Sequence, residues 1–337
     1  MEELRSFLQP YFLSLTQKQL RCDFRSTTLI TETGEVYAWG SSGFGNQLSE
    51  TPSLIERVHP IRTLVTNQSS YSAYVTVDGR LYVRRSTNPW SLIELPSVVT
   101  SVSLGEECLL VLTLDGSAYQ YECERASEQI ETPYLIDLPF PACQVQTYSG
   151  SHHMVTIDGS LYSFGRNDSG QLGLGNYDDN IGIPRKARVD EPVISVSCGD
   201  LHTVILTLSG TVYTCGGNWD AQLGHGDRDL IRYLVVPKPL PLESPCTFVA
   251  SGGWHNFVIL RNGKVYVWGN GTTGELGTGV VGDDDYLYYP TLLKFEGTVQ
   301  SIGAGFSHSA LLTSDGSVYT CGDVDGITAQ STFVKVM

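Results

Sequence analysis

Residues Ser195–Gly224 read S-V-S-C-G-D-L-H-T-V-I-L-T-L-S-G-T-V-Y-T-C-G-G-N-W-D-A-Q-L-G. Most of this stretch recurs at Ala250–Gly277 as A-S-G-G-W-H-N-F-V-I-L-R-N-G-K-V-Y-V-W-G-N-G-T-T-G-E-L-G. Part of it returns at Ile302–Gly322 as I-G-A-G-F-S-H-S-A-L-L-T-S-D-G-S-V-Y-T-C-G. Self-similarity of this kind marks a repeat architecture, so we expect the chain to be built from copies of one structural unit.

Each copy carries a glycine that is followed three residues later by a tyrosine. The pairs are Gly34 and Tyr37, Gly79 and Tyr82, Gly116 and Tyr119, Gly159 and Tyr162, Gly210 and Tyr213, Gly263 and Tyr266, and Gly316 and Tyr319. The residue before the glycine is usually Asp or Asn, which is typical of a tight hairpin turn. Alternating runs on either side, such as His202–Leu208 and Thr211–Cys215, predict two antiparallel strands in every copy.

Two more strands complete each unit. One follows a proline, as in Thr291–Phe295 after Pro290, and another precedes the hairpin, as in Val193–Cys198. Four strands make a propeller blade, and a closed ring of blades removes exposed sheet edges. The sequence therefore predicts an all-β fold, a seven-bladed β-propeller of four-stranded antiparallel blades, as one domain over residues 1–337. Repeats two and three, around Arg84 and Glu122, are degenerate, and we expect blades with trimmed outer loops.

The two ends of the chain leave the closure of the ring open. Pro10–Leu15 followed by Gln19–Cys22 resembles Pro290–Phe295 followed by Val299–Gly303. Counted from these proline-led strands, the strand-like run Thr332–Met337 is one strand more than seven blades require. Either the N-terminal strand or the tail, residues 323–337, is expected to close the ring. Residues 1–9 are expected to form a short cap or a frayed end.

Composition restricts the classes of partner and compartment. The net charge is -15, from 36 acidic and 21 basic residues, which argues against a nucleic-acid surface and favours a protein partner with a basic patch. The 8 cysteines form no C-x-x-C pair, and Cys215 and Cys321 replace Trp268 of another repeat. Buried reduced thiols fit a cytoplasmic or nuclear protein. We expect neither a signal peptide in Met1–Thr16 nor a membrane span.

The shared pattern combines C-G-x-x-H, L-T-x-D-G, V-Y-x-W-G-x-N and G-Q-L-G-x-G, and Ser163–Gly175 reads S-F-G-R-N-D-S-G-Q-L-G-L-G. This pattern resembles the regulator of chromosome condensation repeat, a family of seven-bladed β-propellers. The resemblance covers nearly the whole chain, closely in repeats four to seven, weakly in repeat one and poorly in two and three. It implies a binding role: the founding member is an exchange factor for the small GTPase Ran and docks on nucleosomes. Others regulate cilia or microtubules, assist tRNA-modification proteins, sense light or inhibit enzymes, and one fold hosts many functions.

In the founding member, acidic and histidine side chains on loops of one face approach the GTPase. The positions that match those loops are Asp200, His202, Trp254, His255 and His308. The middle repeats show no insertion that matches the family's exchange wedge, and the N-terminus has no basic tail of the kind that docks on nucleosomes. The 5 tryptophans are spread over separate repeats, which does not fit a light sensor.

Three histidines, His202, His255 and His308, each stand eight residues before the turn glycine. A repeated histidine at a strand start usually forms a hydrogen bond with a neighbouring loop carbonyl, and equivalent positions in a ring lie too far apart to share a metal. The G-Q-L-G runs lack the strand–glycine–helix setting of a phosphate site, and no nucleophile motif is present. We therefore expect no metal, no cofactor and no catalytic residues.

One segment departs from its siblings: Gly279–Pro290 reads G-V-V-G-D-D-D-Y-L-Y-Y-P. Tyrosine offers a large contact area, and an acidic run steers basic partners. The partner-binding residues predicted from it are Asp283, Asp284, Asp285, Tyr286, Tyr288 and Tyr289. Alternatively, the carboxylates are simply solvated and the tyrosines begin an outer strand. Asn176–Asn180 (N-Y-D-D-N) occupies the same place in repeat four and is a second candidate.

Together these features predict a non-enzymatic scaffold or adaptor that binds proteins in a cytosolic or nuclear complex. We expect a monomer or one subunit of a hetero-complex. The alternative, which the family resemblance suggests, is an exchange factor or regulator of a small Ran-like GTPase.

Overall fold

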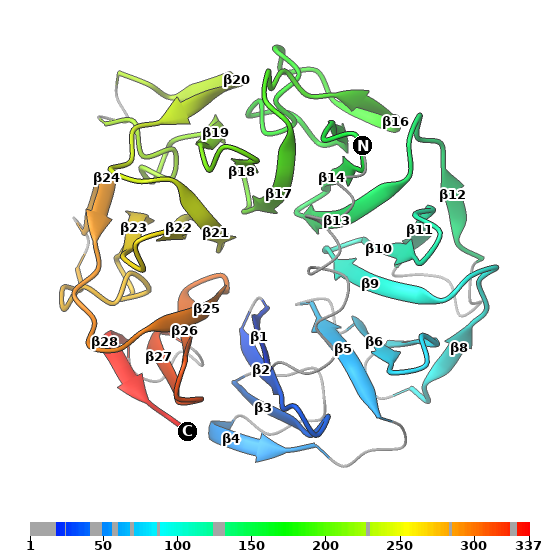
Figure 1. Cartoon of the computed structure of the whole chain (residues 1–337), viewed down its shortest axis with the longest axis horizontal. Coiled ribbons are helices and arrows are strands. Elements are labelled where there is room, and N and C mark those ends of the chain that lie inside the picture. The colour runs from blue at the N-terminus through cyan, green and yellow to red at the C-terminus, as the bar shows by residue number, and fades with distance from the viewer. Residues whose placement is uncertain are drawn as a thin grey trace.

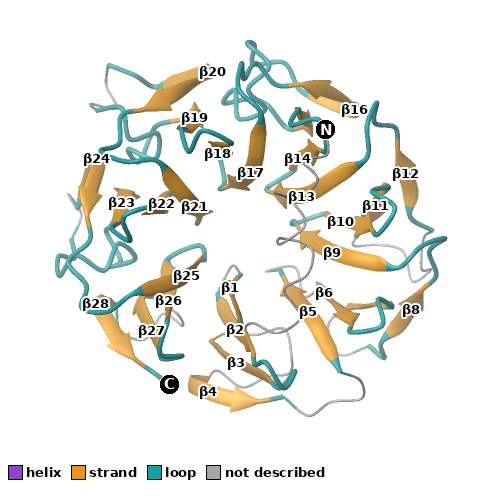
Figure 2. Ribbon diagram, viewed as in Figure 1, coloured by secondary structure: helices purple, strands orange, loops and turns teal. Residues whose placement is uncertain are grey.

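The computed structural model describes residues 18–23, 25–40, 49–55, 60–67, 71–85, 88–123, 132–226, 230–282, 285–323 and 329–337. These residues form seven four-stranded antiparallel sheets around a central axis, and they contain no helix (Figures 1 and 2). The predicted seven-bladed all-β propeller is confirmed. Within every sheet the four strands are consecutive in the chain, so each blade is a local unit.

The first three blades consist of β1 (Gln19–Cys22), β2 (Ser26–Ile30), β3 (Val36–Gly40) and β4 (Ser49–Leu54); β5 (Ile61–Thr66), β6 (Tyr71–Thr76), β7 (Leu81–Arg85) and β8 (Ser91–Ile93); and β9 (Val99–Leu104), β10 (Cys108–Thr113), β11 (Ala118–Glu122) and β12 (Tyr134–Ile136). Blades four and five consist of β13 (Ala142–Tyr148), β14 (Ser151–Thr156), β15 (Leu161–Gly165) and β16 (Asn180–Lys186); and β17 (Val193–Cys198), β18 (His202–Thr207), β19 (Val212–Gly217) and β20 (Tyr233–Leu240). Blades six and seven consist of β21 (Cys246–Ser251), β22 (His255–Leu260), β23 (Val265–Asn270) and β24 (Tyr286–Leu292); and β25 (Val299–Ala304), β26 (His308–Thr313), β27 (Val318–Gly322) and β28 (Gln330–Lys335).

The first strand of each blade faces the centre and the fourth lies on the rim (Figure 1). The hairpin between the second and third strands is closed by the turn that the sequence predicted. In blade three, Gly116 has a φ of 82°, a conformation that suits glycine. Thr113 Oγ1 donates to Asp115 Oδ1 over 2.6 Å, and the same carboxylate accepts the Ser117 N–H at 3.2 Å. The T-x-D-G-S pattern is therefore a self-contained turn.

The W-G motif of one blade packs against the G-Q-L-G motif of the preceding blade. Trp268 is fully buried, and its Nε1 donates to the Gln222 carbonyl of blade five over 2.9 Å. Where cysteine replaces this tryptophan, the thiol makes the equivalent contact with the preceding blade: Cys215 Sγ lies 3.7 Å from Gln171 O, and Cys321 Sγ lies 3.4 Å from Glu275 O. These two motifs therefore form packing contacts between neighbouring blades.

Degenerate repeats two and three form regular blades. Their outer strands, β8 and β12, are the shortest of the described strands at three residues each. Strands β6, β7, β9 and β10 of these blades contribute to one buried hydrophobic cluster that includes Val75, Leu81, Val102 and Val111. The core of the blade therefore survives without the outer-loop motifs.

Side-chain packing closes the ring between β1 and β25, which lie side by side (Figure 1). Leu20 and Trp39 of blade one share a buried cluster with Leu312 of blade seven, and Lys18 Nζ donates to Gly316 O over 3.0 Å. Because each blade begins with its inner strand, counting from the proline-led strands was wrong: those strands end a blade. Strand β28 is simply the outer strand of blade seven, paired with β27. The expected strand Pro10–Leu15 and the cap at residues 1–9 lie outside the described residues.

Candidate protein-binding face

The propeller has two distinct faces. The loop face carries the connections between the first and second strands and between the third and fourth strands of each blade, such as residues 199–201 and 218–226. The turn face carries the hairpin turns and the links to the next blade, such as residues 208–211 and 241–245. On the loop face the two connections of a blade are bonded together, as by the Asn270 N–H to Trp254 O at 3.0 Å.

Histidines of the C-G-x-x-H motif lie beneath the loop face. His202, His255 and His308 are fully buried. His202 Nε2 donates to Asn256 Oδ1 over 2.7 Å, and the other two form hydrogen bonds with Ser309 Oγ (2.8 Å) and Thr27 Oγ1 (3.0 Å). Each partner is a side chain in the next blade, not the loop carbonyl expected from the sequence, because the ring brings the second strand of the next blade against the imidazole. The histidines join successive blades.

The glycine of the same motif makes these contacts possible. A Cβ atom on Gly252 would overlap both the Gly305 carbonyl oxygen and the His255 ring, and Gly199 and Gly305 are equally confined. Burial lowers the pKa of His202 to about 4, of His255 to about 3 and of His308 to about 4. The imidazoles are therefore neutral near pH 7.

Of the five residues matched to the family's GTPase-facing loops, two are partly exposed on the loop face. Asp200 accepts the Ser149 hydroxyl through Oδ1, and its backbone N–H donates to Gly253 O over 3.0 Å. Trp254 packs edge-on against Phe306, with ring centroids 4.5 Å apart. Of the five matched residues, Asp200 and Trp254 are therefore accessible to a partner on this face, whereas the three histidines are fully buried.

The acidic and tyrosine-rich segment Gly279–Pro290 runs from the loop face into the outer strand β24 at the rim. Asp283 and Asp284 lie outside the described residues. Asp285 turns inward: its Oδ2 atom is buried and has no hydrogen-bond partner within the described ranges, and burial raises the pKa of its carboxyl group. Tyr286, Tyr288 and Tyr289 lie in the outer strand β24, where Tyr289 is 62% exposed and covers Gly226 of blade five. These tyrosines therefore lie in an outer strand, as in the alternative interpretation of the sequence, and their role in partner binding stays a prediction.

An exposed aromatic cluster connects blades four and five on the loop face. The Tyr233 ring meets Tyr177 and Trp219 edge-on, each at 5.6 Å between centroids, and Arg232 lies 6.0 Å above the Trp219 ring. Tyr177 is 51% exposed and Trp219 is 46% exposed. We name Tyr177, Trp219 and Tyr233 the aromatic cluster. Tyr177 belongs to the second sequence candidate, Asn176–Asn180. Trp219 was missed, although it replaces Asp168 of repeat four at an exposed turn position.

Carboxylates border the aromatic cluster. Asp178 and Asp179 are exposed beside Tyr177, and Asp168 is exposed in the neighbouring turn. Arg166 pairs with Asp168, at 2.7 Å between Nη2 and Oδ2. Because like charges repel on approach, this border disfavours acidic partners and favours basic ones.

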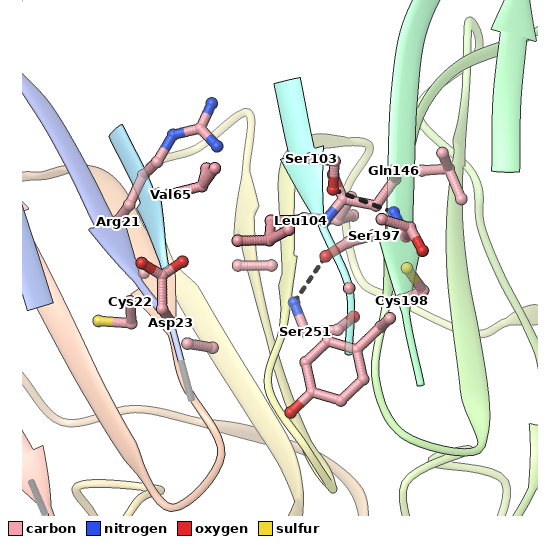
Figure 3. A pocket seen from close by; sticks show the side chains of 18 of the residues that line it. Arg21, Cys22, Asp23, Val65, Ser103, Leu104, Gln146, Ser197, Cys198 and Ser251 are labelled. Atoms are coloured by element: carbon pink, nitrogen blue, oxygen red, sulfur yellow. Dashed lines mark hydrogen bonds between the residues drawn. The ribbon is translucent and has the colours of Figure 1, made fainter. Parts of the chain in front are cut away.

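A cavity of about 310 Å³ occupies the loop-face end of the central channel (Figure 3). Serines of the inner strands connect neighbouring blades along its wall by hydrogen bonds. Ser103 Oγ accepts the Thr147 N–H at 3.0 Å, and Ser197 Oγ accepts the Ser251 N–H at 2.9 Å. Its charged lining residues are Arg21, Asp23 and Glu106. In the described ranges, no three His, Cys, Asp or Glu side chains converge as a metal site, and no helix could cross a membrane.

The chain matches the family model "Regulator of chromosome condensation (RCC1) repeat" over residues 158–206, 209–259 and 262–312. It is 33% identical to the Ultraviolet-B receptor UVR8 of Arabidopsis thaliana over 89% of this chain and 64% of that protein. It is 29% identical to the human Regulator of chromosome condensation over 50% of this chain and 39% of that protein. The match thus spans less than two thirds of either relative.

Solved structures include the same architecture. The crystal structure of Prp20p from Saccharomyces cerevisiae, described together with its binding to Gsp1p and histones, superposes with a TM-score of 0.73. The two chains are 19% identical, and the superposition covers 86% of this chain and 80% of Prp20p. At this identity the likeness concerns the fold. From its repeats and its ring of seven blades, the chain belongs to the regulator of chromosome condensation (RCC1) repeat family.

Proposed function

We propose that this propeller is a non-enzymatic scaffold or adaptor that binds a protein partner through its loop face. The observation that carries the proposal is the aromatic cluster. Tyr177 and Trp219 are about half exposed, so they contribute little to the core and are available to a partner. Exposed tyrosine and tryptophan concentrate binding energy at protein interfaces. The proposal treats residues 1–337 as one domain, acting as a monomer or as one subunit of a hetero-complex.

Charge indicates the kind of partner. The net charge of -15 and the carboxylates bordering the aromatic cluster would speed the approach of a protein with a basic patch. Tyr286, Tyr288 and Tyr289 of β24 would flank such a partner at the rim, and the neighbouring Asp283, Asp284 and Asp285 stay candidate contacts from the sequence. We place the complex in the cytosol or the nucleus, in keeping with eight unpaired cysteines.

Affinity capture with matched variants tests this proposal. The double variant Tyr177→Ala and Trp219→Ala should retain about tenfold less partner than the unmodified chain, since both side chains would lie in the interface. The matched control is Leu114→Ala with Phe140→Ala, which removes exposed apolar groups (68% and 43% exposed) from the turn face. Quantitative mass spectrometry should find the same partner retained by this control. Loss of the partner from the control, with retention by the aromatic variant, would place the interface on the turn face instead.

A second candidate is an exchange factor for a Ran-like GTPase, as in the family's founding member. It is favoured by Asp200, which matches the family's GTPase-facing loop and is partly exposed on the loop face. Release of fluorescent GDP from a captured GTPase distinguishes the two functions. As an adaptor, the propeller should leave the release rate unchanged within about twofold. Acceleration of about a hundredfold that is lost in Asp200→Ala would establish exchange activity instead.

A further inference from the structure

The central channel contains buried polar groups that have no hydrogen-bond partner among the residues that the structure describes. Arg21 and Asp23 stand two positions apart on the inner edge of blade one, so both face the channel (Figure 3). Tyr148, Ser197 and Ser251 line the same cavity from blades four, five and six. We propose that this cavity binds a free α-amino acid, with its carboxylate on Arg21 and its ammonium group beside Asp23 and the Tyr148 hydroxyl.

Arg21 supplies the site for the carboxylate. Within the described part of the chain, its guanidinium group makes no hydrogen bond and no ion pair. Burial lowers the pKa of this group, and only the nearby charge of Asp23 opposes that effect. An unpaired guanidinium group in a half-buried channel is unfavourable, and a carboxylate satisfies it through two parallel hydrogen bonds.

Asp23 and Tyr148 supply the site for the ammonium group. Oδ2 of Asp23 accepts the Thr66 N–H at 3.0 Å and the Thr66 hydroxyl at 2.9 Å, whereas Oδ1 accepts no hydrogen bond from the described residues. The Tyr148 hydroxyl is buried and has no hydrogen-bond partner in the part of the chain that the structure describes. Burial raises the pKa of Tyr148, and the nearby Asp200, Cys198, Glu106 and Asp23 raise it further, so the phenol stays protonated and can form a hydrogen bond with a ligand.

A second unsatisfied hydroxyl lies in the same wall. Ser251 is 9% exposed, and its Oγ atom has no hydrogen-bond partner among the described residues. Its backbone N–H already donates to Ser197 Oγ. Buried hydroxyls without partners are uncommon, and here two of them line one cavity. A ligand with hydrogen-bond donors and acceptors at both ends would satisfy them.

The charge arrangement selects the ligand class. A polyanion such as a phosphate ester would be repelled by Asp23 and Glu106, and a simple cation would leave Arg21 unpaired. A zwitterion satisfies both signs at once. The volume of about 310 Å³ lies at the small end of ligand pockets, which suits a molecule of amino-acid size.

Thermal unfolding with added ligands tests the proposal. Each standard α-amino acid is added at about 10 mM, a concentration at which even a millimolar binder raises the Tm. At least one should raise the Tm, while sodium acetate and methylammonium chloride, each carrying one half of the zwitterion, should not. The proposal is overturned if no amino acid raises the Tm, or if acetate or methylammonium alone raises it equally.

Variants locate the binding in the channel. Tyr148→Phe removes only an unpartnered hydroxyl, so the ligand-free Tm should not fall, while calorimetry should show affinity weakened about two- to tenfold. Arg21→Gln should weaken affinity more than tenfold. Tyr162→Phe, in the same blade but outside the channel, is the control and should bind normally. Unchanged affinity in both Tyr148→Phe and Arg21→Gln would overturn the assignment. None of these results depends on the protein partner proposed above.

Discussion

Acidification from about pH 7 to about pH 5 is expected to remove about 2 kcal/mol of stability for each fully buried histidine. Burial lowers the pKa of His153 and His255 to about 3, and that of His202 and His308 to about 4. In the unfolded chain these groups titrate near pH 6.5. Because the folded pKa is the lower one, the stabilisation is complete above about pH 6.5 and is lost as the pH falls towards about 4.

The physical reason is that protonation would bury an unpaired N–H. In His202, His255 and His308 the Nδ1 atom is buried and has no hydrogen-bond partner among the residues described, while Nε2 already bonds to the next blade. Carboxyl groups with a raised pKa act in the opposite direction: burial raises the pKa of Glu275 to about 7 and of Asp23 to about 6, and it also raises that of Asp285. They offset part of the loss. The net loss remains a large fraction of the roughly 5–15 kcal/mol that stabilises a typical domain.

Urea unfolding at several pH values measures this effect. The double variant His202→Gln and His255→Gln tests whether these histidines cause it, because glutamine side chains do not titrate. It should reduce proton uptake on unfolding near pH 5.5 by nearly two protons. An unchanged pH dependence in this variant would mean that other groups cause the acid sensitivity.

The second large effect is expected from Gly252→Ala, which should cost about 3 kcal/mol or more, or prevent folding. The added methyl group would overlap the Gly305 carbonyl oxygen and the His255 ring at once. That carbonyl accepts the Gly253 N–H at 3.0 Å, so blades six and seven cannot separate without breaking the bond. Urea unfolding of the purified variant measures the loss.

Gly263→Ala is the matched control. Gly263 sits in a hairpin turn with a φ of 82°, yet a Cβ atom there would meet nothing within 4 Å. The substitution should cost only about 1 kcal/mol, the strain of an alanine in a left-handed conformation. If both variants lost the same free energy of unfolding, backbone strain would explain both losses. The close approach of the blades at Gly252 would then not be the cause.

Much of the fold could be predicted because its signals are local. The turn glycines and the tyrosines that follow them repeat along the chain, and they locate the hairpins without any long-range information. The phase of the blades could not be found this way, because a proline-led strand can begin one unit or end another. Only its pairing, as between β27 and β28, decides which.

The candidate sites were harder to predict because they combine distant residues. His202 bonds to a side chain 54 positions away, and the aromatic cluster brings Tyr177 of one blade to Tyr233 of the next. The channel cavity gathers Arg21, Tyr148 and Ser251 from three blades. No spacing rule within one repeat reveals such contacts. By contrast, the unusual Gly279–Pro290 was visible in the sequence, and the structure shows its tyrosines forming an ordinary outer strand.

Hydrogen–deuterium exchange on the propeller in complex with its captured partner tests most directly whether the loop face is the binding face. We expect slower exchange in residues 176–179 and 218–226, which carry Tyr177 and Trp219, and unchanged exchange in the turns at residues 114–117 and 208–211. Protection confined to those turns, with residues 176–179 and 218–226 exchanging as in the free protein, would contradict binding through the loop face.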